Sequence, residues 1–243
     1  MTVVVPAHFE EGIIGTTLEA LHASVGMPFT TVVVYDVDED PTAEVVRAGS
    51  ARWPEARLEK NHYGRGALGA IRTGLDVADT EYAVVFMADM SDDPAVIREM
   101  VRVADAGADV VSASRYMRGG SQVGGPRLKS LMSRIAGQSL HLLTGIPTRD
   151  PTNSFRLYRT SFLREVTVES TGGFEIGLEL TVKAFLSGHE VAEVPASWHD
   201  RTEGESKFNM RRWLPLYLRW YLRAVRSAPL GIGRRRTPPP RGG

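Results

Sequence analysis

The stretch Tyr82–Pro94, Y-A-V-V-F-M-A-D-M-S-D-D-P, decides the fold class that this sequence predicts. The apolar run Ala83–Met87 is typical of a buried strand in the middle of a parallel sheet. The run stops at Asp89, and residues 92–94 carry the signals of a helix start. Open α/β sheets bind ligands at the carboxyl ends of their strands, so Asp89 is expected to face a binding crevice. The alternative is that Asp89 only caps a turn.

Apolar strands and helical patterns alternate on both sides of this stretch. Strands are predicted at 2–5, 31–35, 57–60, 82–87 and 109–113, with a helix after each of the first four. This alternation predicts an α/β fold with a doubly wound, mostly parallel sheet. Beyond residue 114 strands and helices no longer alternate regularly. The later chain is predicted to hold helices at 129–143, 174–186 and 210–225, short strands at 155–158 and 190–195, a Gly-rich mobile loop at 114–126 and a polar loop at 198–208.

The length and composition limit the classes of protein to which this chain could belong. A chain of 243 residues with 42% hydrophobic residues suits one large α/β domain, or one domain plus an appendage. Cysteine is absent, which excludes disulfides, thiolate nucleophiles and zinc–thiolate sites. No apolar run approaches the ~20 residues of a spanning helix, and Met1 leads directly into a strand-like segment, so no signal peptide is expected. These features predict a cytoplasmic protein.

The formal net charge of zero hides an asymmetry between the two ends of the chain. From Arg201 onward the sequence holds 11 Lys and Arg against 2 Asp and Glu, so the preceding part is acidic. An acidic body argues against nucleic acid as a partner. A basic C-terminal end suits phosphates or anionic lipid.

Carboxylates are expected to gather at one edge of the sheet. If the strands are parallel, Asp36 and Asp89 lie at this edge, and Glu10 adds a further carboxylate. The nearby glycines at 64, 66 and 69 permit close backbone approach at a helix start. Carboxylates beside such a turn suit a nucleotide whose ribose and base donate hydrogen bonds and whose diphosphate arrives with a divalent cation.

Several motifs in the first half resemble those of the family-two inverting glycosyltransferases. They are P-A-H-F-E at 6–10, V-V-V-Y-D-V-D-E-D-P-T at 32–42, N-H-Y-G-R-G-A at 61–67 and M-A-D at 87–89. Motifs of the second half are similar to the dolichyl- or polyprenyl-phosphate mannose or glucose synthase branch. These are S-R-Y at 114–116, D-P-T-N-S-F-R at 150–156, G-F-E-I-G-L-E at 173–179 and E-G-E-S-K at 203–207. The resemblance implies a GT-A-type, Rossmann-like catalytic domain, which we expect over residues 1–208.

The same resemblance implies roles for individual residues. The nucleotide-binding residues would be Pro6, Ala7, His8, Glu10, Asp36, Gly66, Met87, Ala88 and Asp89. Asp36 would recognise the base, and Asp89 with Ser91 would hold Mg²⁺ or Mn²⁺. Arg115 would face the sugar or the acceptor phosphate, and Arg201 and Lys207 would clamp the diphosphate. Asp89, Arg115, Arg201 and Lys207 are the predicted catalytic residues. The further cations available to an acceptor phosphate are Arg118, Arg127 and Lys129.

The resemblance also implies the reaction, which is transfer of a hexose from a nucleoside diphosphate sugar to polyprenyl phosphate. Met87 replaces the first Asp of the usual D-A-D, and His8-Phe9 and Tyr35 are further departures. The choice between GDP-mannose and UDP-glucose therefore stays open. A hydroxyl acceptor would instead require a carboxylate base, with Asp92, Asp93 or Asp150 as candidates, although helix capping is the simpler role for the first two. A third alternative is a non-catalytic nucleotide-sugar-binding subunit.

The composition of the last predicted helix indicates where in the cell the acceptor is located. Trp213–Val225 mixes aromatics and leucines with arginines, which suits an amphipathic helix in a bilayer interface or against a membrane-protein subunit. The alternative is a helix packed on the domain's own core or on another subunit. We assign this segment to 209–226, followed by a disordered basic tail at 227–243. A peripheral enzyme at the inner face of the cell membrane is expected. Glu175 and Glu179 would form either a surface pair or part of the border of the site.

Overall fold

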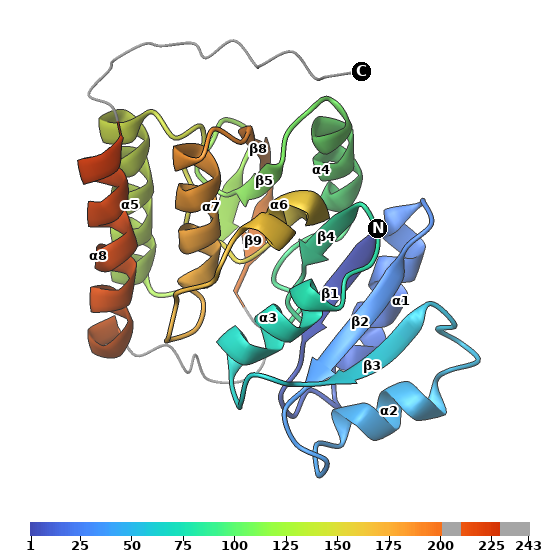
Figure 1. The fold of residues 1–243 in the computed structure, drawn as a ribbon. Helices are drawn as coiled ribbons and strands as arrows, with labels where there is room; N and C mark the ends of the chain where they lie inside the picture. Colours follow the sequence, from blue (N-terminus) through green and yellow to red (C-terminus); the bar gives the residue numbers. More distant parts are fainter. Residues whose placement is uncertain (201–209, 229–243) are drawn as a thin grey trace.

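The computed structural model describes residues 1–200 and 210–228, which form helices around one central sheet (Figure 1). The main sheet has seven strands in the order β3-β2-β1-β4-β7-β5-β8. These strands are β1 (Thr2–Pro6), β2 (Thr30–Tyr35), β3 (Ala56–Lys60), β4 (Tyr82–Val85), β5 (Val110–Ser114), β7 (Arg156–Arg159) and β8 (Val191–Pro195). β1 pairs in parallel with β2 and β4, whereas β7 runs antiparallel to β4 and β5. The predicted doubly wound, mostly parallel α/β sheet is confirmed.

Helices cover both faces of this sheet. They are α1 (Ile14–Val25), α2 (Thr42–Ala48), α3 (Ala67–Asp76), α4 (Val96–Asp105), α5 (Arg127–Thr144), α6 (Thr160–Glu165), α7 (Ile176–Leu186) and α8 (Met210–Ser227). Successive side chains of a strand point to opposite faces. Val3 and Val5 of β1 therefore pack in the core that includes Ile97 of α4, while Val4 packs in the core that includes Ile71 of α3. Both faces of β1 are buried, as its unbroken apolar sequence predicts.

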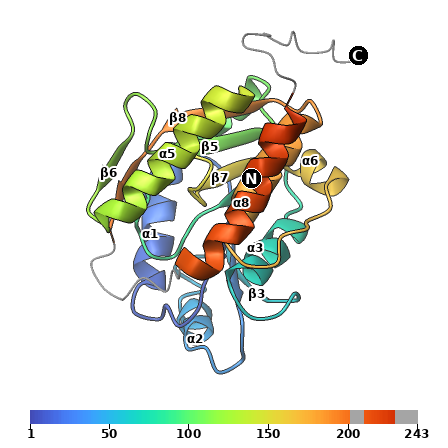
Figure 2. The same ribbon diagram turned by 90° about the vertical axis from the view of Figure 1, so that its left-hand side faces the viewer.

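α5, α7 and α8 enclose a third, smaller core at one end of the sheet. Trp220 of α8 is only 1% exposed and packs with Leu140 of α5 and Val182 of α7. The inner side of α8 thus lies on the protein's own core, which was one of the alternatives for this helix. Figure 2 shows α5 and α8 side by side across the front of the molecule.

Two segments predicted as loops contain strands. Within 114–126, β6 (Ser121–Val123) pairs in parallel with β9 (Ser197–His199), which lies at the start of the predicted polar loop. The prediction of a mobile loop over the whole of 114–126 is therefore wrong. The two strands have three residues each, and their paired positions are 76 residues apart in the chain, so local patterning carries no signal of their pairing.

Of the two alternatives for Glu175 and Glu179, the surface pair is wrong. Both side chains are buried. The carboxylate of Glu175 accepts hydrogen bonds from the backbone N–H groups of Gly172 and Gly173, at 2.7 and 2.6 Å. Glu179 likewise accepts from two backbone N–H groups and pairs with Lys183 at 2.7 Å. These carboxylates fix the segment before α7.

Candidate functional site

The carboxyl ends of β1, β2 and β4 meet at one edge of the sheet, as the parallel arrangement predicted. Pro6 at the end of β1 lies in register with Val34 of β2, and the N–H of Ala7 donates to the Val34 carbonyl at 2.8 Å. Asp36 follows β2 directly, and Asp89 follows β4 after a short extension. The structure therefore brings the predicted nucleotide-side residues onto neighbouring strand ends.

The loop after β1 has a constrained backbone. Phe9 has φ of 57°, in a left-handed region that non-glycine residues rarely occupy. The carboxylate of Asp40 accepts from the N–H of Phe9 at 3.0 Å, and the hydroxyl of Thr42 accepts from the N–H of Glu10 at 2.8 Å. The first loop is thus held by the turn after β2. Asp40 was not singled out from the sequence, although it lies in the acidic run that follows this strand.

Asp36 anchors the glycine turn that opens α3. Its carboxylate accepts from Asn61 Nδ2 at 2.7 Å and from the N–H of Gly66 at 2.8 Å. His8 Nδ1 lies 3.7 Å from the same carboxylate. A carboxylate accepts about four hydrogen bonds, so Asp36 retains lone pairs for a ligand while its orientation is fixed by the protein.

Gly69 makes this arrangement possible. A Cβ atom at Gly69 would lie 2.2 Å from the carbonyl oxygen of Gly64, which is closer than atoms can approach. Gly64 and Gly66 have φ of 87° and 110°, so all three glycines of the turn are required by its geometry.

The turn after β4 carries the predicted metal ligands. Met90, between Asp89 and Ser91, has φ of 54°. Asp89 Oδ1 accepts from the N–H of Ser91 at 3.1 Å, and the Ser91 carbonyl accepts from the N–H of His199 in β9 at 2.8 Å. Positive φ at a non-glycine residue persists only where neighbouring contacts enforce it, and such residues cluster at binding sites.

The donor atoms at this turn fit a hard divalent cation. The Ser91 hydroxyl is buried and has no hydrogen-bond partner among the described residues, which is unusual for a buried polar atom. Mg²⁺ is commonly bound by one or two protein oxygens, with substrate phosphates and water completing the shell. Asp89 and Ser91 match that pattern. The described residues contain no group of three or more His, Cys, Asp or Glu that could bind a metal by themselves.

Arg115, at the end of β5, is held in a buried ion pair. Its Nε and Nη2 donate to the two carboxylate oxygens of Asp150 at 2.6 and 2.8 Å, and Nη2 also donates to Thr152 at 3.1 Å. Burial opposes both charges. The attraction between the partners outweighs it, so the pKa of Arg115 is raised and that of Asp150 is lowered. No hydrogen bond from Arg115 Nη1 reaches any other described residue.

Asn153 joins the two halves of the site. Its amide donates to Asp92 Oδ1 at 3.2 Å and to the carbonyl of Ala113 at 3.1 Å, linking the turn after β4 to the end of β5. Burial raises the pKa of Asp92 to about 7, and the hydrogen bond from Asn153 opposes the shift. The N-cap position of α4 is Ala95 and has no side-chain cap, so the expected capping by Asp92 or Asp93 is wrong; Asp93 accepts from the N–H of Ala95 at 2.9 Å, just before the helix begins at Val96.

The remaining predicted residues lie on loops and at the start of α5, or outside the described part of the chain. Arg118 and Arg127 are exposed, and neither makes an ion pair with another described residue. Lys129 lies in the first turn of α5. Arg201 and Lys207 lie outside the described residues, so their assignment as diphosphate clamps stays a prediction. Met87 and Ala88 precede Asp89, and Ala88 is buried.

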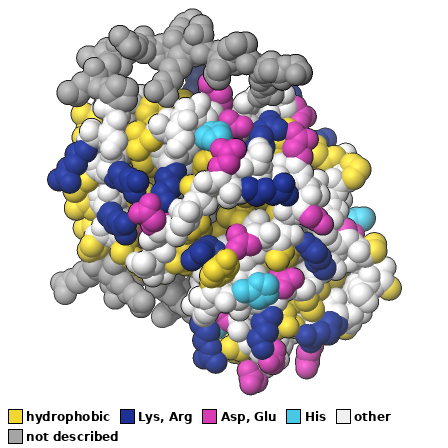
Figure 3. All heavy atoms as spheres, viewed as in Figure 1, with side chains coloured by type: hydrophobic (Ala, Val, Ile, Leu, Met, Phe, Trp, Pro, Cys, Tyr) yellow, Lys and Arg dark blue, Asp and Glu magenta, His cyan; other side chains and the backbone are white. Residues whose placement is uncertain are grey.

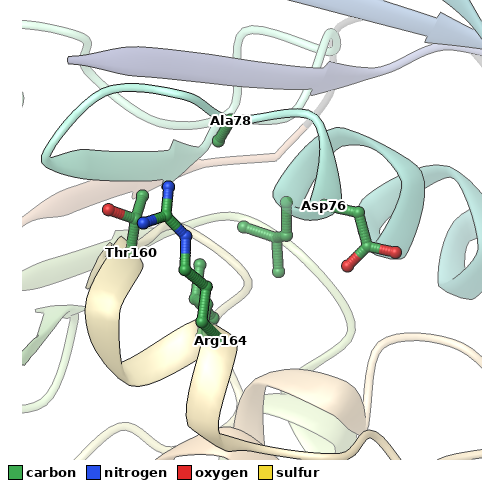
Figure 4. A pocket seen from close by; sticks show the side chains of 6 residues that line it. Asp76, Ala78, Thr160 and Arg164 are labelled. Atoms are coloured by element: carbon green, nitrogen blue, oxygen red, sulfur yellow. The ribbon is translucent and has the colours of Figure 1, made fainter.

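A hollow between α3 and α6 lies elsewhere (Figure 4). Its lining includes Asp76, Ala78, Thr160 and Arg164. Thr160 hydrogen-bonds Glu81, just before β4 begins, so this hollow is at the end of the strand opposite to Asp89. In Figure 4 the Asp76 carboxylate points away from Arg164. The hollow is separate from the candidate site.

Comparison with known proteins finds curated relatives of this chain. Over 216 residues the chain is 27% identical to a dolichol-phosphate mannosyltransferase of Pyrococcus furiosus, covering 85% of this chain and 58% of that protein. It is 29% identical over 152 residues to a polyprenol monophosphomannose synthase of Mycolicibacterium smegmatis, covering 60% of this chain and 57% of that protein. The chain thus spans less than three fifths of the length of these curated relatives.

Solved structures share the fold. Glucosyl-3-phosphoglycerate synthase of Mycobacterium tuberculosis, crystallised with Mn²⁺, UDP and glucosyl-3-phosphoglycerate, matches with a TM-score of 0.69 and 16% identity, over 96% of this chain and 82% of that one. This similarity supports a GT-A-type fold. The family model described as glycosyl transferase family 2 matches residues 2–167, which is most of the chain. The chain belongs to glycosyl transferase family 2.

Proposed function

We propose that this protein transfers a hexose, with inversion, from a nucleoside diphosphate sugar to a polyprenyl phosphate. Family membership and the two curated relatives support the class of reaction. The observation that carries the proposal is the bridge made by Asn153. It ties Asp92, just after the Asp89–Ser91 turn, to Ala113 of β5, two residues before Arg115. A donor diphosphate and an anionic acceptor would meet at that bridge.

The donor would bind along the ends of β1, β2 and β4. Asp36 has its orientation fixed and lone pairs available, which suits hydrogen bonds from a nucleobase. Pro6, Ala7, His8 and Glu10 would line the base and ribose. Asp89 and Ser91 would hold Mg²⁺ or Mn²⁺, which would neutralise charge on the departing diphosphate. GDP-mannose and UDP-glucose are the two donors to compare.

The acceptor would bind at Arg115. Asp150 and Thr152 occupy Nε and Nη2, so Nη1 is the nitrogen that would donate to a phosphate oxygen. That oxygen would attack the anomeric carbon as the bond from this carbon to the diphosphate breaks, and the nucleoside diphosphate would leave. A phosphate is already anionic, so the attack requires no general base.

The state of the three candidate bases favours a phosphate over a hydroxyl acceptor. Asp150 is fully buried in its ion pair with Arg115 and has a lowered pKa, which makes it a poor proton acceptor. Asp92 is buried against Asn153, and the carboxylate of Asp93 accepts from the N–H of Ala95 just before α4. Of the three, only Asp93 is exposed, so it is the base that a hydroxyl acceptor would have to use.

A polyprenyl phosphate acceptor also implies contact with a membrane. No helix among the described residues is long and apolar enough to cross one. The outer side of α8 exposes Leu214, Leu218 and Leu222 beside arginines, which suits peripheral attachment at the inner face of the cell membrane or to a membrane-protein subunit.

Transfer of radiolabelled hexose tests this proposal. Purified protein with Mn²⁺ and detergent-dispersed polyprenyl phosphate is given GDP-mannose or UDP-glucose, and label is measured in the organic phase. We expect transfer from one donor, at least about 10³-fold slower in Asp89→Ala, and unchanged in Asp38→Ala, an exposed carboxylate near the same edge. Label that never enters the organic phase while donor still binds would contradict the proposal and favour a hydroxyl acceptor or a non-catalytic subunit.

A further inference from the structure

α5 and α8 together present an unusual outer surface. Neither helix contains an aspartate or a glutamate over its 18 residues. Their outward leucines and isoleucine are between 36% and 77% exposed, which is rare for so many large apolar side chains in one place. This surface comprises Leu128, Leu131, Ile135 and Leu142 on α5 with Leu214, Leu218 and Leu222 on α8.

Helical spacing arranges these side chains as two adjacent stripes. Residues 214, 218 and 222 are four apart and therefore share one side of α8. Tyr221 hydrogen-bonds Ser139 of α5 at 2.8 Å on one flank of α8, while Arg219 and Arg223 reach Glu169 on the other flank. The leucine stripe falls between these flanks, next to α5. α5 and α8 lie side by side in both ribbon views (Figures 1 and 2).

Cations border this apolar band on both of its edges. Arg219 and Arg223 lie beyond the leucine stripe of α8, and Arg127 and Arg134 lie on the side of α5 away from α8. Figure 3 shows Lys and Arg side chains gathered next to hydrophobic ones on the left of the molecule, where α8 lies in Figure 1. An apolar centre with arginine borders matches a bilayer whose acyl chains meet an anionic headgroup layer.

The opposite side of α5 contacts the acceptor arginine. Ser133 Oγ lies 2.5 Å from Thr152 Oγ1 and accepts a long hydrogen bond of 3.5 Å from Arg115 Nη2. A Cβ at Gly137 would lie 2.0 Å from the carbonyl oxygen of Arg149, so the helix rests directly on the backbone that carries Asp150. α5 therefore touches the Arg115–Asp150 pair with one side and exposes leucines on the other.

We propose that α5 couples contact with an anionic bilayer to the position of Arg115. The apolar band of α5 and α8 rests on the lipid, and Ser133 and Gly137 set the arginine from the same rigid helix. Ser133 is thus a positioning residue for acceptor binding. The role of Arg115 in binding the acceptor rests on the proposed function. The contact between the apolar band and the bilayer does not.

A second copy of this chain is a poorer occupant of the band. Two such faces in contact would bring arginine borders together. Glu169 already pairs with Arg219 and Arg223, and neither α5 nor α8 offers a further carboxylate for Arg127 and Arg134. An anionic bilayer supplies negative charge for these arginines of α5.

Vesicle flotation tests the contact without any need for turnover. Wild-type protein is expected to float with vesicles of phosphatidylcholine and phosphatidylglycerol, and at least tenfold less with phosphatidylcholine alone. Leu131→Gln/Ile135→Gln should lose flotation, whereas Val123→Gln, an equally exposed apolar position on β6, should retain it. Equal flotation of the double variant and wild type would overturn the proposal, as would a stable dimer that disperses in the double variant.

The coupling is tested by amide hydrogen exchange and by kinetics. Anionic vesicles should slow exchange in residues 114–116 and 149–153 of the wild type, and not in Ser133→Ala. Ser133→Ala should still float, with a raised KM for polyprenyl phosphate in vesicles and an unchanged KM for the donor, and Ser133→Thr should restore the wild-type value. Ser139→Ala, on the same helix, is the control. Full slowing of exchange in Ser133→Ala would overturn the coupling. Wild-type protein that floats and shows slowed exchange without any transfer would contradict the proposed function alone.

Discussion

At the ends of β1, β2 and β4, carboxylates are held by backbone N–H groups and an amide from nearby turns. At the end of β5, the carboxylate of Asp150 is held by a guanidinium from another segment. In keeping with the proposed function, we call the first region the donor side and the second the acceptor side. On the donor side the carboxylates keep lone pairs for a ligand and a cation. On the acceptor side the two buried charges neutralise each other, and one nitrogen of Arg115 is left for an anion.

This difference predicts that substitutions on the acceptor side affect folding first, whereas those on the donor side affect ligand affinity first. The reason is that a buried charge without its partner is costly, while a hydrogen bond between neighbouring turns contributes about 1 kcal/mol. Four substitutions can break or sharpen this comparison.

The largest effect is expected for Asp150→Ala. It leaves the guanidinium of Arg115 buried without a counter-charge, so the free energy of unfolding should fall by about 3–5 kcal/mol. Chemical denaturation measures this change. Asp93→Ala removes only an exposed hydrogen bond from the N–H of Ala95 and should cost about 1 kcal/mol. Equal losses in the two variants would remove the distinction between the two sides.

Asp92→Asn should change the pH dependence of stability. Burial raises the pKa of Asp92 in the folded protein from 3.8 to about 7, so the folded state binds the proton more tightly than the unfolded state. The free energy of unfolding of the wild type therefore falls as the pH rises from 3.8 to about 7. Asn stays neutral, so the variant should gain stability relative to wild type by about 2–4 kcal/mol between pH 4 and pH 8. Melting curves with a chelator measure it, and a pH-independent difference would contradict the burial of a charged Asp92.

Gly69→Ala sharpens the account of the donor side. The added Cβ would collide with the Gly64 carbonyl and displace the turn held by Asp36. Overpacking of this kind costs about 1–3 kcal/mol, and we expect it to raise the KM of the donor with little change in that of the acceptor. Gly12→Ala, where nothing lies within 4 Å of the new atom, is the control. An unchanged donor KM would indicate that the glycine turn lies outside the donor site.

Asp36→Asn should have the smallest effect. The amide of Asn has the same shape as the carboxylate but only one acceptor oxygen. If this oxygen faces Gly66, the hydrogen bond from the Gly66 N–H loses its charge assistance; if the NH₂ group faces Gly66, two donors meet and the bond is lost. Loss of about 1 kcal/mol corresponds to roughly a fivefold weaker affinity for the nucleotide. Calorimetric titration measures this affinity, with Asp38→Asn as the exposed control. A loss of folding stability larger than that of Asp150→Ala would reverse the comparison.

The donor side was largely predictable from the sequence, because its parts are local. Apolar strands stop at Asp36 and Asp89, and the glycines at 64, 66 and 69 mark a turn before a helix, so residue order alone brings them to one edge of a parallel sheet. The same reasoning predicted the main sheet and the long helices.

The acceptor side was less predictable, because its contacts join distant segments. Arg115 and Asp150 were both noted, but their pairing depends on how β7 inserts antiparallel between β4 and β5. Asn153 makes hydrogen bonds across two strand ends, and β9 pairs with β6 over a long separation. The exposed leucines of α5 were also missed. Their spacing indicates an amphipathic helix, but only the packed structure shows which side is outside.

The most direct test of the division between donor and acceptor sides is a pair of binding titrations on two variants. Nucleoside diphosphate with Mn²⁺, and a short-chain polyprenyl phosphate in detergent, are each titrated into wild type, Asp89→Asn and Arg115→Lys. We predict that Asp89→Asn loses metal-dependent nucleotide binding and keeps the lipid phosphate, and that Arg115→Lys does the reverse. If Arg115→Lys instead weakens nucleotide binding and leaves the lipid phosphate unaffected, the acceptor does not bind at Arg115 and the division is wrong.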